Sequence, residues 1–212
     1  MTREEKPEKN EGGVRERLLT AALELFNSKG YAAASVREIV AASGVTKPVL
    51  YYYFGNKEGL YLELMNGSFA EFESSLSQIT TLQGCVTERI NHFCVMMLDL
   101  IMENIEVVRL IYAIYYGPPQ GAPHINFDTY FTRMLDTIHD LVREGIGSGE
   151  LRPNDSTDVA WTVISILNTA MEEQLCHTPA RLDGEQMVRM LRLVMEGLAT
   201  KSSGAVLGAS RL

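Results

Sequence analysis

The side chains best suited to bind another molecule lie in one short stretch, from Thr46 to Lys57. A threonine at a helix start can bind a phosphate oxygen with its hydroxyl group, together with the unpaired N–H groups of the first turn. Lys47 can reach a guanine or a phosphate, and Val49 can contact the methyl group of a thymine. The tyrosines that follow can donate hydrogen bonds to phosphates without adding charge. The stretch therefore predicts contacts to duplex DNA.

Three short helices are predicted to position this stretch. Apolar spacing indicates helices over 14–28, 36–42 and 46–53. Ser35 followed by Glu38 is a capping-box pattern at the start of the middle helix, and Gly44 permits a sharp turn after it. Three helices with a short break between the second and third are typical of a helix-turn-helix unit. Three consecutive tyrosines also fit partly buried packing, and Tyr53 is the one expected to pack inside the unit.

The rest of the chain also has the apolar spacing of helices, and no stretch alternates as a strand would. A long helix begins at Lys57, and five more are expected over 86–103, 105–116, 127–147, 155–176 and 183–199. The sequence therefore predicts an all-α chain of about nine helices. Its expected parts are a flexible arm (1–13), a helix-turn-helix domain (14–60), a helical ligand-binding and dimerisation domain (61–200) and a flexible tail (201–212).

Charge is distributed unevenly along the 212 residues, whose net charge is −8. Residues 1–66 hold nine Lys and Arg against nine Asp and Glu, whereas the remainder carries the whole negative excess. A neutral segment followed by an acidic one fits contact of the first part with a polyanion, although acidic surfaces also serve solubility. No apolar run approaches the length of a membrane span, so no membrane partner is expected and the composition predicts a cytoplasmic protein.

Motifs of the common enzyme classes are absent from the sequence. There is no nucleophile elbow, HExxH pair or phosphate-binding loop, and the glycines from Gly145 to Gly149 follow a predicted helix rather than a strand. No catalytic residue, cofactor or metal ion is therefore expected. Cys85, Cys94 and Cys176 lack metal-ligand spacing and are expected to be reduced thiols. A redox- or metal-sensing role for these cysteines is the alternative within the class of regulators.

The segment LLTAALELFNSKGYAAASVREIVAASGVTKPVLYYYFGNKEGLYLELM (18–65) resembles the DNA-binding domain of the tetracycline-repressor (TetR) family. The resemblance runs through ALELFNSKGY, SVREIVAASGV and TKPVLYYYFGNKEGL. It implies an all-helical fold in which three N-terminal helices are joined by a fourth to a larger body that binds a ligand and dimerises. Lys47 matches the position that most often enters the major groove. The positions that match phosphate contacts are Ser35, Thr46, Tyr51, Tyr52 and Lys57.

Two positions depart from the family pattern. Pro48 has no N–H group where a glycine amide can serve in relatives, and Tyr53 stands where histidine is common. Together with the α-helical face described above, the predicted DNA-binding set is Ser35, Thr46, Lys47, Pro48, Val49, Tyr51, Tyr52, Tyr53 and Lys57.

By analogy with the family, the last two helices are expected to form a four-helix bundle with a partner subunit. The predicted interface residues are Val163, Leu167, Met171, Met187, Met190, Leu191, Val194 and Leu198. The middle helices are rich in methionine and aromatic residues, which fit an adaptable cavity, although such residues more often form core. The predicted ligand-binding residues are Phe93, Met96, Met97, Tyr112, Tyr115, Phe127, Phe131, Met134, Trp161, Asn168 and Glu172.

These inferences together predict a ligand-responsive transcriptional regulator. The expected partners are a duplex DNA operator, a second copy of the chain, and a small-molecule effector of unknown identity. The expected action is repression, relieved when a small apolar or aromatic effector releases the homodimer from a near-palindromic operator. The alternative outside this class is a helical dimer that binds small molecules without acting on DNA.

Overall fold

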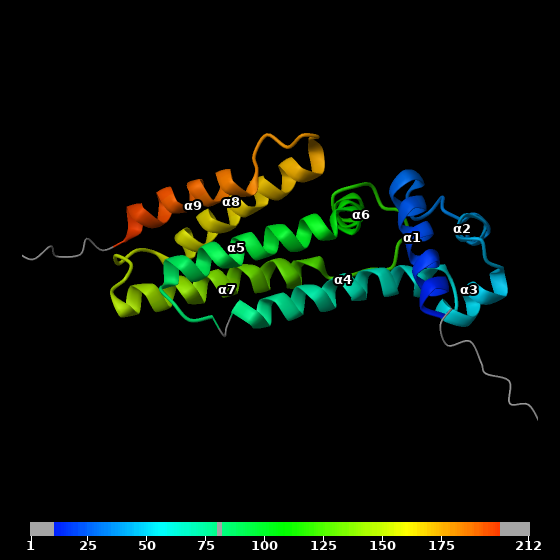
Figure 1. The fold of residues 1–212 in the computed structure, drawn as a ribbon, viewed down its shortest axis with the longest axis horizontal. Helices are drawn as coiled ribbons and strands as arrows, with labels where there is room; N and C mark the ends of the chain where they lie inside the picture. Colours follow the sequence, from blue (N-terminus) through cyan, green and yellow to red (C-terminus); the bar gives the residue numbers. More distant parts are fainter. Residues whose placement is uncertain (1–10, 80–81, 200–212) are drawn as a thin grey trace, which may run out of the picture. The chain divides into compact units, whose positions relative to one another are not determined.

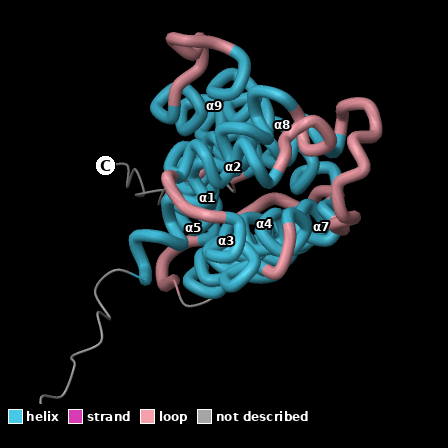
Figure 2. The backbone as a smooth tube through the Cα atoms, turned by 90° about the vertical axis from the view of Figure 1, so that its right-hand side faces the viewer, coloured by secondary structure: helices cyan, strands magenta, loops and turns pink. Residues whose placement is uncertain are grey.

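The computed structural model describes residues 11–79 and 82–199, and these residues form nine helices and no strand (Figure 1 and Figure 2). The prediction of an all-α chain of about nine helices is thereby confirmed. No helix in the described part is long and apolar enough to cross a membrane. The helices are α1 (Glu11–Lys29), α2 (Val36–Ser43), α3 (Lys47–Phe54), α4 (Lys57–Ile79), α5 (Val86–Glu103), α6 (Ile105–Tyr115), α7 (Phe127–Ser148), α8 (Ser156–Cys176) and α9 (Gly184–Leu198).

The predicted N-terminal arm overlaps the first helix. The arm was expected over 1–13, but α1 begins at Glu11, so residues 11–13 are helical. Residues 1–10 and the predicted tail over 201–212 lie outside the described residues.

The short helices α2 and α3 begin and end at residues whose chemistry fixes those ends. The hydroxyl group of Ser35 accepts a hydrogen bond from the amide of Glu38, and the Glu38 carboxylate accepts one from the amide of Ser35. Gly44 ends α2 in the left-handed conformation at φ 67°. Thr46 is the N-cap of α3, and Pro48 lies in the first turn, where a missing N–H group costs nothing. The predicted capping box and helix break are therefore present.

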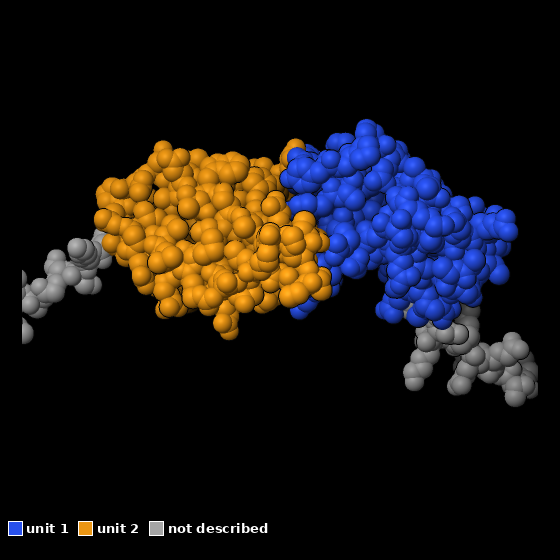
Figure 3. Space-filling model, turned by 90° about the horizontal axis from the view of Figure 1, so that it is seen from above, with its two compact units in different colours: residues 1–74, 100–127 blue, residues 75–99, 128–212 orange. Residues whose placement is uncertain are grey.

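The chain divides into two compact units, coloured blue and orange in Figure 3. Unit 1 consists of Met1–Ser74 and Leu100–Phe127, and unit 2 of Ser75–Asp99 and Asp128–Leu212. The domain boundary expected after residue 60 does not follow this division. The reason is that α6 and the loop after it pack into the same hydrophobic core as the helix-turn-helix.

The core of unit 1 is built around three aromatic rings. Phe26, Tyr31 and Tyr61 are almost completely buried, and their ring centroids lie 5.3, 6.2 and 5.1 Å apart in pairs. Ile39 of α2 and Leu50 of α3 are fully buried in the same core. Burying an aliphatic side chain of this size stabilises a fold by about 1.5–3 kcal/mol. These two residues therefore hold α2 and α3 on α1 and α4.

In unit 2, α8 packs along α9 (Figure 1). Val163 and Leu167 of α8 and Met187 and Leu191 of α9 are fully buried. Leu151, just before α8, forms an isolated antiparallel bridge with Ala199 after α9. The start of α8 and the end of α9 are thus joined.

Candidate nucleic-acid interface

The outward face of α3 is exposed because one leucine fixes the opposite face. Leu50 is fully buried, whereas Tyr52 is 78% exposed and Tyr51 is 48% exposed. Lys47 and Pro48 at the start of the helix are exposed as well. The first turn carries no acidic residue, so no charge there repels a phosphate group. The structure brings these predicted residues together on one exposed helix.

Thr46 and the start of α3 have the groups that bind an anion. Thr46 is exposed and has the extended backbone of an N-cap, but its side chain makes no capping hydrogen bond. Its hydroxyl group can therefore bind an acceptor outside the chain. Lys47 supplies an amide N–H group in the first turn, and Pro48 supplies none. Val49 is half-buried and offers a small apolar surface beside them.

Tyr53 differs from the two tyrosines before it. It is half-buried, and its ring centroid lies 5.1 Å from that of Tyr52 and 6.1 Å from that of Phe54. Its ring therefore packs against its neighbours along α3. Tyr51 and Tyr52 are the exposed tyrosines of this helix.

Ser35 is exposed, but its hydroxyl group already has two partners. It donates to Oε2 of Glu38 at 2.8 Å and accepts from the Glu38 amide. The Lys29 ammonium lies 2.5 Å from the same carboxylate. Lys29, and after it Ser35, lower the pKa of Glu38 to about 2. Ser35 therefore holds the start of α2, and a phosphate would have to compete with Glu38 for its hydroxyl group.

The Lys57 ammonium is bound to the turn between α1 and α2. Nζ donates to the carbonyl oxygen of Tyr31 at 2.8 Å and to that of Ala34 at 3.0 Å. It also lies 4.2 Å from the centroid of the Tyr31 ring, and burial lowers the pKa of Lys57. An ammonium group has three N–H donors, so one is left for a phosphate. Lys57 thus has a structural role in this domain, and its contact to a phosphate stays a prediction.

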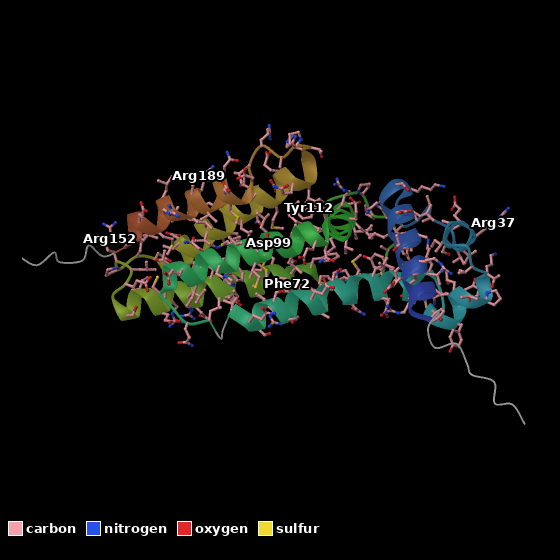
Figure 4. All side chains as sticks on the ribbon, viewed as in Figure 1. Arg37, Phe72, Asp99, Tyr112, Arg152 and Arg189 are labelled. Atoms are coloured by element: carbon pink, nitrogen blue, oxygen red, sulfur yellow. The ribbon has the colours of Figure 1, made fainter. Side chains whose placement is uncertain are left out.

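Arg37 on α2 is an exposed cation that the predicted set omits. Its side chain projects outward from α2, as Figure 4 shows, and it has no ion-pair partner among the described residues. The helical pattern contains the signal that would have found it. Val36, Ile39 and Val40 mark the inner face of α2, so Arg37 falls on the outer face.

Most other cations of the helix-turn-helix are engaged within the chain. Arg15 pairs with Glu63, Lys29 with Glu38, and Arg17 donates to the carbonyl oxygen of Ser43. In α2 and α3, Arg37 and Lys47 are therefore the cations that no described carboxylate neutralises. Within the described part of the helix-turn-helix, the positive charge available to a polyanion therefore lies on these two helices.

The predicted ligand residues are divided between the two units. Phe93 and Met97 are buried in unit 2, where the rings of Phe131 and Trp161 lie 5.6 Å apart and Trp161 is 47% exposed. The members in unit 1 are Tyr112, Tyr115 and Phe127. The members in unit 2 are Phe93, Met96, Met97, Phe131, Met134, Trp161, Asn168 and Glu172.

Two grooves in unit 2 are lined by other residues. One has a volume of about 330 Å³ and lies where the end of α4 meets α5 and α7, with Arg89 and Asp136 in its lining. The other has a volume of about 400 Å³ and lies between α5 and α9, lined in part by Leu98, Asp99 and Arg192. Neither groove is lined by a predicted ligand residue. The effector site stays a prediction.

Five of the eight predicted interface residues pack inside the protomer. Apolar spacing identifies the buried stripe of each helix, and in this fold α8 and α9 bury those stripes against their own unit. Such side chains have no surface left for a partner subunit. The five buried residues are Val163, Leu167, Met171, Met187 and Leu191.

An apolar strip of α9 stays outside this core. Leu193, which the prediction omitted, is 72% exposed, and Met190 and Val194 beside it are half-buried, as is the predicted Leu198. On the outer face of α8, the hydroxyl groups of Thr162, Ser165 and Thr169 each donate to the carbonyl oxygen four residues earlier, at 2.7–2.8 Å. Their donors are therefore satisfied within the helix. Covering this face would leave none of these three donors without an acceptor.

The three cysteines differ in their burial. Cys94 is buried, and burial raises its pKa to about 12. Cys85 and Cys176 are exposed, and the pKa of Cys85 is raised, chiefly by partial burial. A raised pKa keeps a thiol protonated and unreactive. No described cluster of three or more His, Cys, Asp or Glu could hold a metal ion.

A family model described as bacterial regulatory proteins of the tetR family matches residues 18–64. These residues run from α1 through α2 and α3 into α4. The chain is 31% identical to the HTH-type transcriptional activator FasR of Mycolicibacterium smegmatis over 134 residues, which cover 63% of this chain and 60% of FasR. The match therefore spans less than two thirds of that relative.

Two further proteins extend the similarity over more of the chain. The HTH-type transcriptional regulator QacR of Staphylococcus aureus is 27% identical over 168 residues, which cover 73% of this chain and 82% of QacR. The crystal structure of AibR in complex with isovaleryl coenzyme A and operator DNA matches with a TM-score of 0.62 and 22% identity. It covers 85% of this chain and 97% of that one, so the two chains share a fold.

Proposed function

Because the chain belongs to the TetR family of bacterial regulatory proteins, we propose that it is a transcriptional repressor that binds operator DNA as a homodimer. The observation that carries the proposal is the exposed face of α3. The buried Leu50 fixes that face, and Lys47 and Tyr52 lie exposed on it. A helix anchored in this way enters the major groove with its N-terminal residues against the base edges.

In the proposed complex, the chemistry of each side chain determines its contact. Lys47 donates to guanine acceptors, and the methyl groups of Val49 contact a thymine. The hydroxyl groups of Tyr51 and Tyr52 donate to phosphates beside the groove, as does that of Thr46 at the helix start. Arg37 adds a charged contact to a phosphate from α2. Lys57 donates its third N–H group to a phosphate while it keeps its two hydrogen bonds within the chain. Neither contact breaks an ion pair of the protein.

Two copies are needed because one recognition helix reads only a half-site. A twofold symmetric dimer places two such helices about one turn of DNA apart, which demands a near-palindromic operator. We infer that the subunits meet through the outer faces of α8 and α9. Leu193 gives that surface an exposed apolar side chain, and the satisfied hydroxyl groups of Thr162 and Ser165 can be covered without loss.

The proposed effector releases the dimer by favouring a conformer with a different helix separation. Binding shifts the population between two conformers by no more than the difference in effector affinity for them. Phe131 and Trp161, in ring contact on α7 and α8, support an apolar or aromatic effector. AibR was crystallised with isovaleryl coenzyme A, so acyl thioesters belong in the first set of compounds to test.

The experiment that tests the proposal is selection of binding sites from random duplex DNA with the purified full-length chain. The selection is run at about physiological salt, where binding through phosphates alone is weakened. The expected result is an enriched near-palindrome with half-sites about one helical turn apart. A matched selection with Lys47→Ala and Tyr52→Ala together should lose the enrichment.

Failure of enrichment needs one further step before it counts against the proposal. The protein is denatured, freed of small molecules, refolded and selected again, so that a co-purified effector cannot mask binding. No enrichment after refolding would overturn the DNA-binding role. A reporter gene behind the enriched sequence then decides between repression and the activation for which FasR is named.

A further inference from the structure

The helix α6 and the loop after it are built into the fold of the DNA-binding helices. Val107 is 8% exposed and Leu110 is fully buried, and both belong to the core that holds α1, α2 and α3. Ile111 and Ile114 of α6 pack against this core, and so does Ala122 of the loop. Figure 1 shows α6 beside α1, with which it is in contact. A segment about fifty residues beyond the helix-turn-helix therefore helps to support it.

Side-chain amides tie this segment to α1 and to the turn that follows it. Nδ2 of Asn27 on α1 donates to the carbonyl oxygen of Glu106 at 2.9 Å and to its carboxylate at 3.1 Å. Beyond α6, Oε1 of Gln120 accepts a hydrogen bond from the Tyr31 amide at 2.8 Å. Nε2 of Gln120 lies 3.4 Å from the carbonyl oxygen of Ala113, which orients the amide group.

The fit between Gln120 and the turn is close. Gly30 has φ 82°, a conformation that residues with side chains rarely adopt. A Cβ atom at Gly30 would lie 2.6 Å from Oε1 of Gln120. The Gln120 amide thus occupies the space that any side chain at position 30 would need.

The peptide groups of Tyr31 are consequently held by side chains from two distant parts of the chain. Gln120 accepts from its N–H group, and Lys57 donates to its carbonyl oxygen at 2.8 Å. Tyr31 is only 7% exposed, so water cannot readily replace either partner. The same turn leads into Ser35, the N-cap of α2. The position of α2, and of α3 packed on it, depends on this turn.

We propose that Gln120 is a positioning residue that sets the orientation of α2 and α3 for specific operator binding. The inference rests on the proposed DNA-binding function and adds to it a residue outside the helix-turn-helix. Gln120 touches no base or phosphate in this role. It acts by holding the Tyr31 peptide, so its loss changes how well α3 fits a particular sequence rather than how strongly the chain attracts phosphates.

The test compares Gln120→Ala and Gln120→Met with wild type in the full-length chain. The methionine keeps most of the side-chain volume and removes the acceptor. His124→Ala is the matched control, because His124 is an exposed residue of the same loop. Affinity is measured for a duplex selected by the wild-type protein and for a random duplex of equal length. Hydrogen exchange of the Tyr31 amide is measured without DNA.

Both Gln120 variants should lose about tenfold in affinity for the selected duplex, because the orientation of α2 and α3 that fits this duplex is then populated in only about a tenth of the molecules. Affinity for the random duplex should not change, because charge alone sets it. The Tyr31 amide should exchange faster in both variants, and His124→Ala should match wild type throughout.

Other outcomes overturn the inference in distinguishable ways. Equal losses on both duplexes would mean a general loss of folding and would exclude a positioning role. Wild-type affinity of Gln120→Met, with loss only in Gln120→Ala, would assign the effect to packing volume. Unchanged selectivity in both variants would reject the inference alone. Absence of any sequence preference in the wild-type protein would reject the proposed function, and the role of Gln120 with it.

Discussion

Lys47 and Arg37 are both exposed cations, but they lie on different helices and should contribute differently to binding. Lys47 is at the start of α3, where it can reach a base edge, and Arg37 is on the outer face of α2. Lys47→Ala should cost about 1–3 kcal/mol on the selected duplex and relax specificity at one base pair. Arg37→Ala should weaken all duplexes alike and reduce the slope of log affinity against log salt by about 1.

The measurement is a salt titration of binding to selected and random duplexes. Arg152→Ala is a suitable control, since Arg152 is an exposed arginine of unit 2 and does not belong to the residues of α2 and α3 proposed to bind DNA. If Lys47→Ala and Arg37→Ala both bound the selected duplex like wild type, the assignment of α3 to the groove would be incorrect.

Lys57 makes a second prediction at the scale of single residues. Its Nζ bridges the carbonyl oxygens of Tyr31 and Ala34, and both residues are buried. Lys57→Met keeps the aliphatic stem and leaves both acceptors without the ammonium, so the free energy of unfolding should fall by about 1–3 kcal/mol.

Chemical denaturation of Lys57→Met measures this effect, with Lys47→Met as the matched control. Lys47 is exposed and has no acidic partner in the described residues, so its replacement should leave the free energy of unfolding unchanged. Equal stability of Lys57→Met and wild type would contradict the structural role of Lys57 and would leave only its predicted contact to a phosphate.

The start of α2 makes a prediction about pH at the scale of one element. Lys29 and Ser35 lower the pKa of Glu38 to about 2 from the ordinary 4.5, so the folded state favours the ionised carboxylate. A lowered pKa contributes stability that is fully present above pH 4.5 and is lost as the pH falls towards 2. Glu38→Gln should therefore be less stable than wild type at neutral pH, and the difference should shrink as the pH falls below 4.5.

Thermal unfolding of both proteins from about pH 7 down to about pH 3 measures that difference. Glu24→Gln serves as the control because Glu24 is an exposed carboxylate on α1 outside the capping box. A difference in stability that stayed constant across this range would show that Glu38→Gln destabilises the protein for a reason other than the lost charge.

The ends of these elements could be predicted because their signals are local. Ser35 with Glu38, and Gly44 after α2, act over three or four residues, and the structure has each of them in the expected role. The partners of Lys57 could not be predicted, because Tyr31 and Ala34 lie 26 and 23 residues away. Apolar spacing likewise predicts which face of α8 is buried. It does not predict whether that face packs within the protomer or against a partner subunit.

At the scale of the whole molecule, the same limit explains the difference in domain boundaries. The resemblance to DNA-binding domains ends at residue 65, and the balanced charge gives way to a negative excess after residue 66. The sequence therefore predicts a compact DNA-binding domain that ends before this point. The fold instead completes the core of that domain with Val107 and Leu110 of α6. A helical pattern identifies α6 but holds no information about its partner, since Leu110 would be apolar in either unit.

Dimerisation gives the last prediction, and it concerns the surface that the protomer leaves uncovered. Leu193 is 72% exposed on α9, and a twofold axis would bury two copies of it. Burial of one leucine is worth about 1.5–3 kcal/mol, so Leu193→Glu should weaken the dimer by at least about 3 kcal/mol, or more than a hundredfold. Sedimentation should then show monomers where wild type is dimeric, with affinity for the palindromic duplex lost in parallel.

Met102→Glu is the matched control, because Met102 is 45% exposed on α5, outside the proposed interface. It should remain dimeric and bind DNA like wild type. A dimeric Leu193→Glu would place the subunit contact on another surface. Monomers that still bound the palindrome with wild-type affinity would contradict the proposal that the operator is bound by a dimer. Since one recognition helix spans a single half-site, the affinity for two half-sites depends on the joining of two subunits.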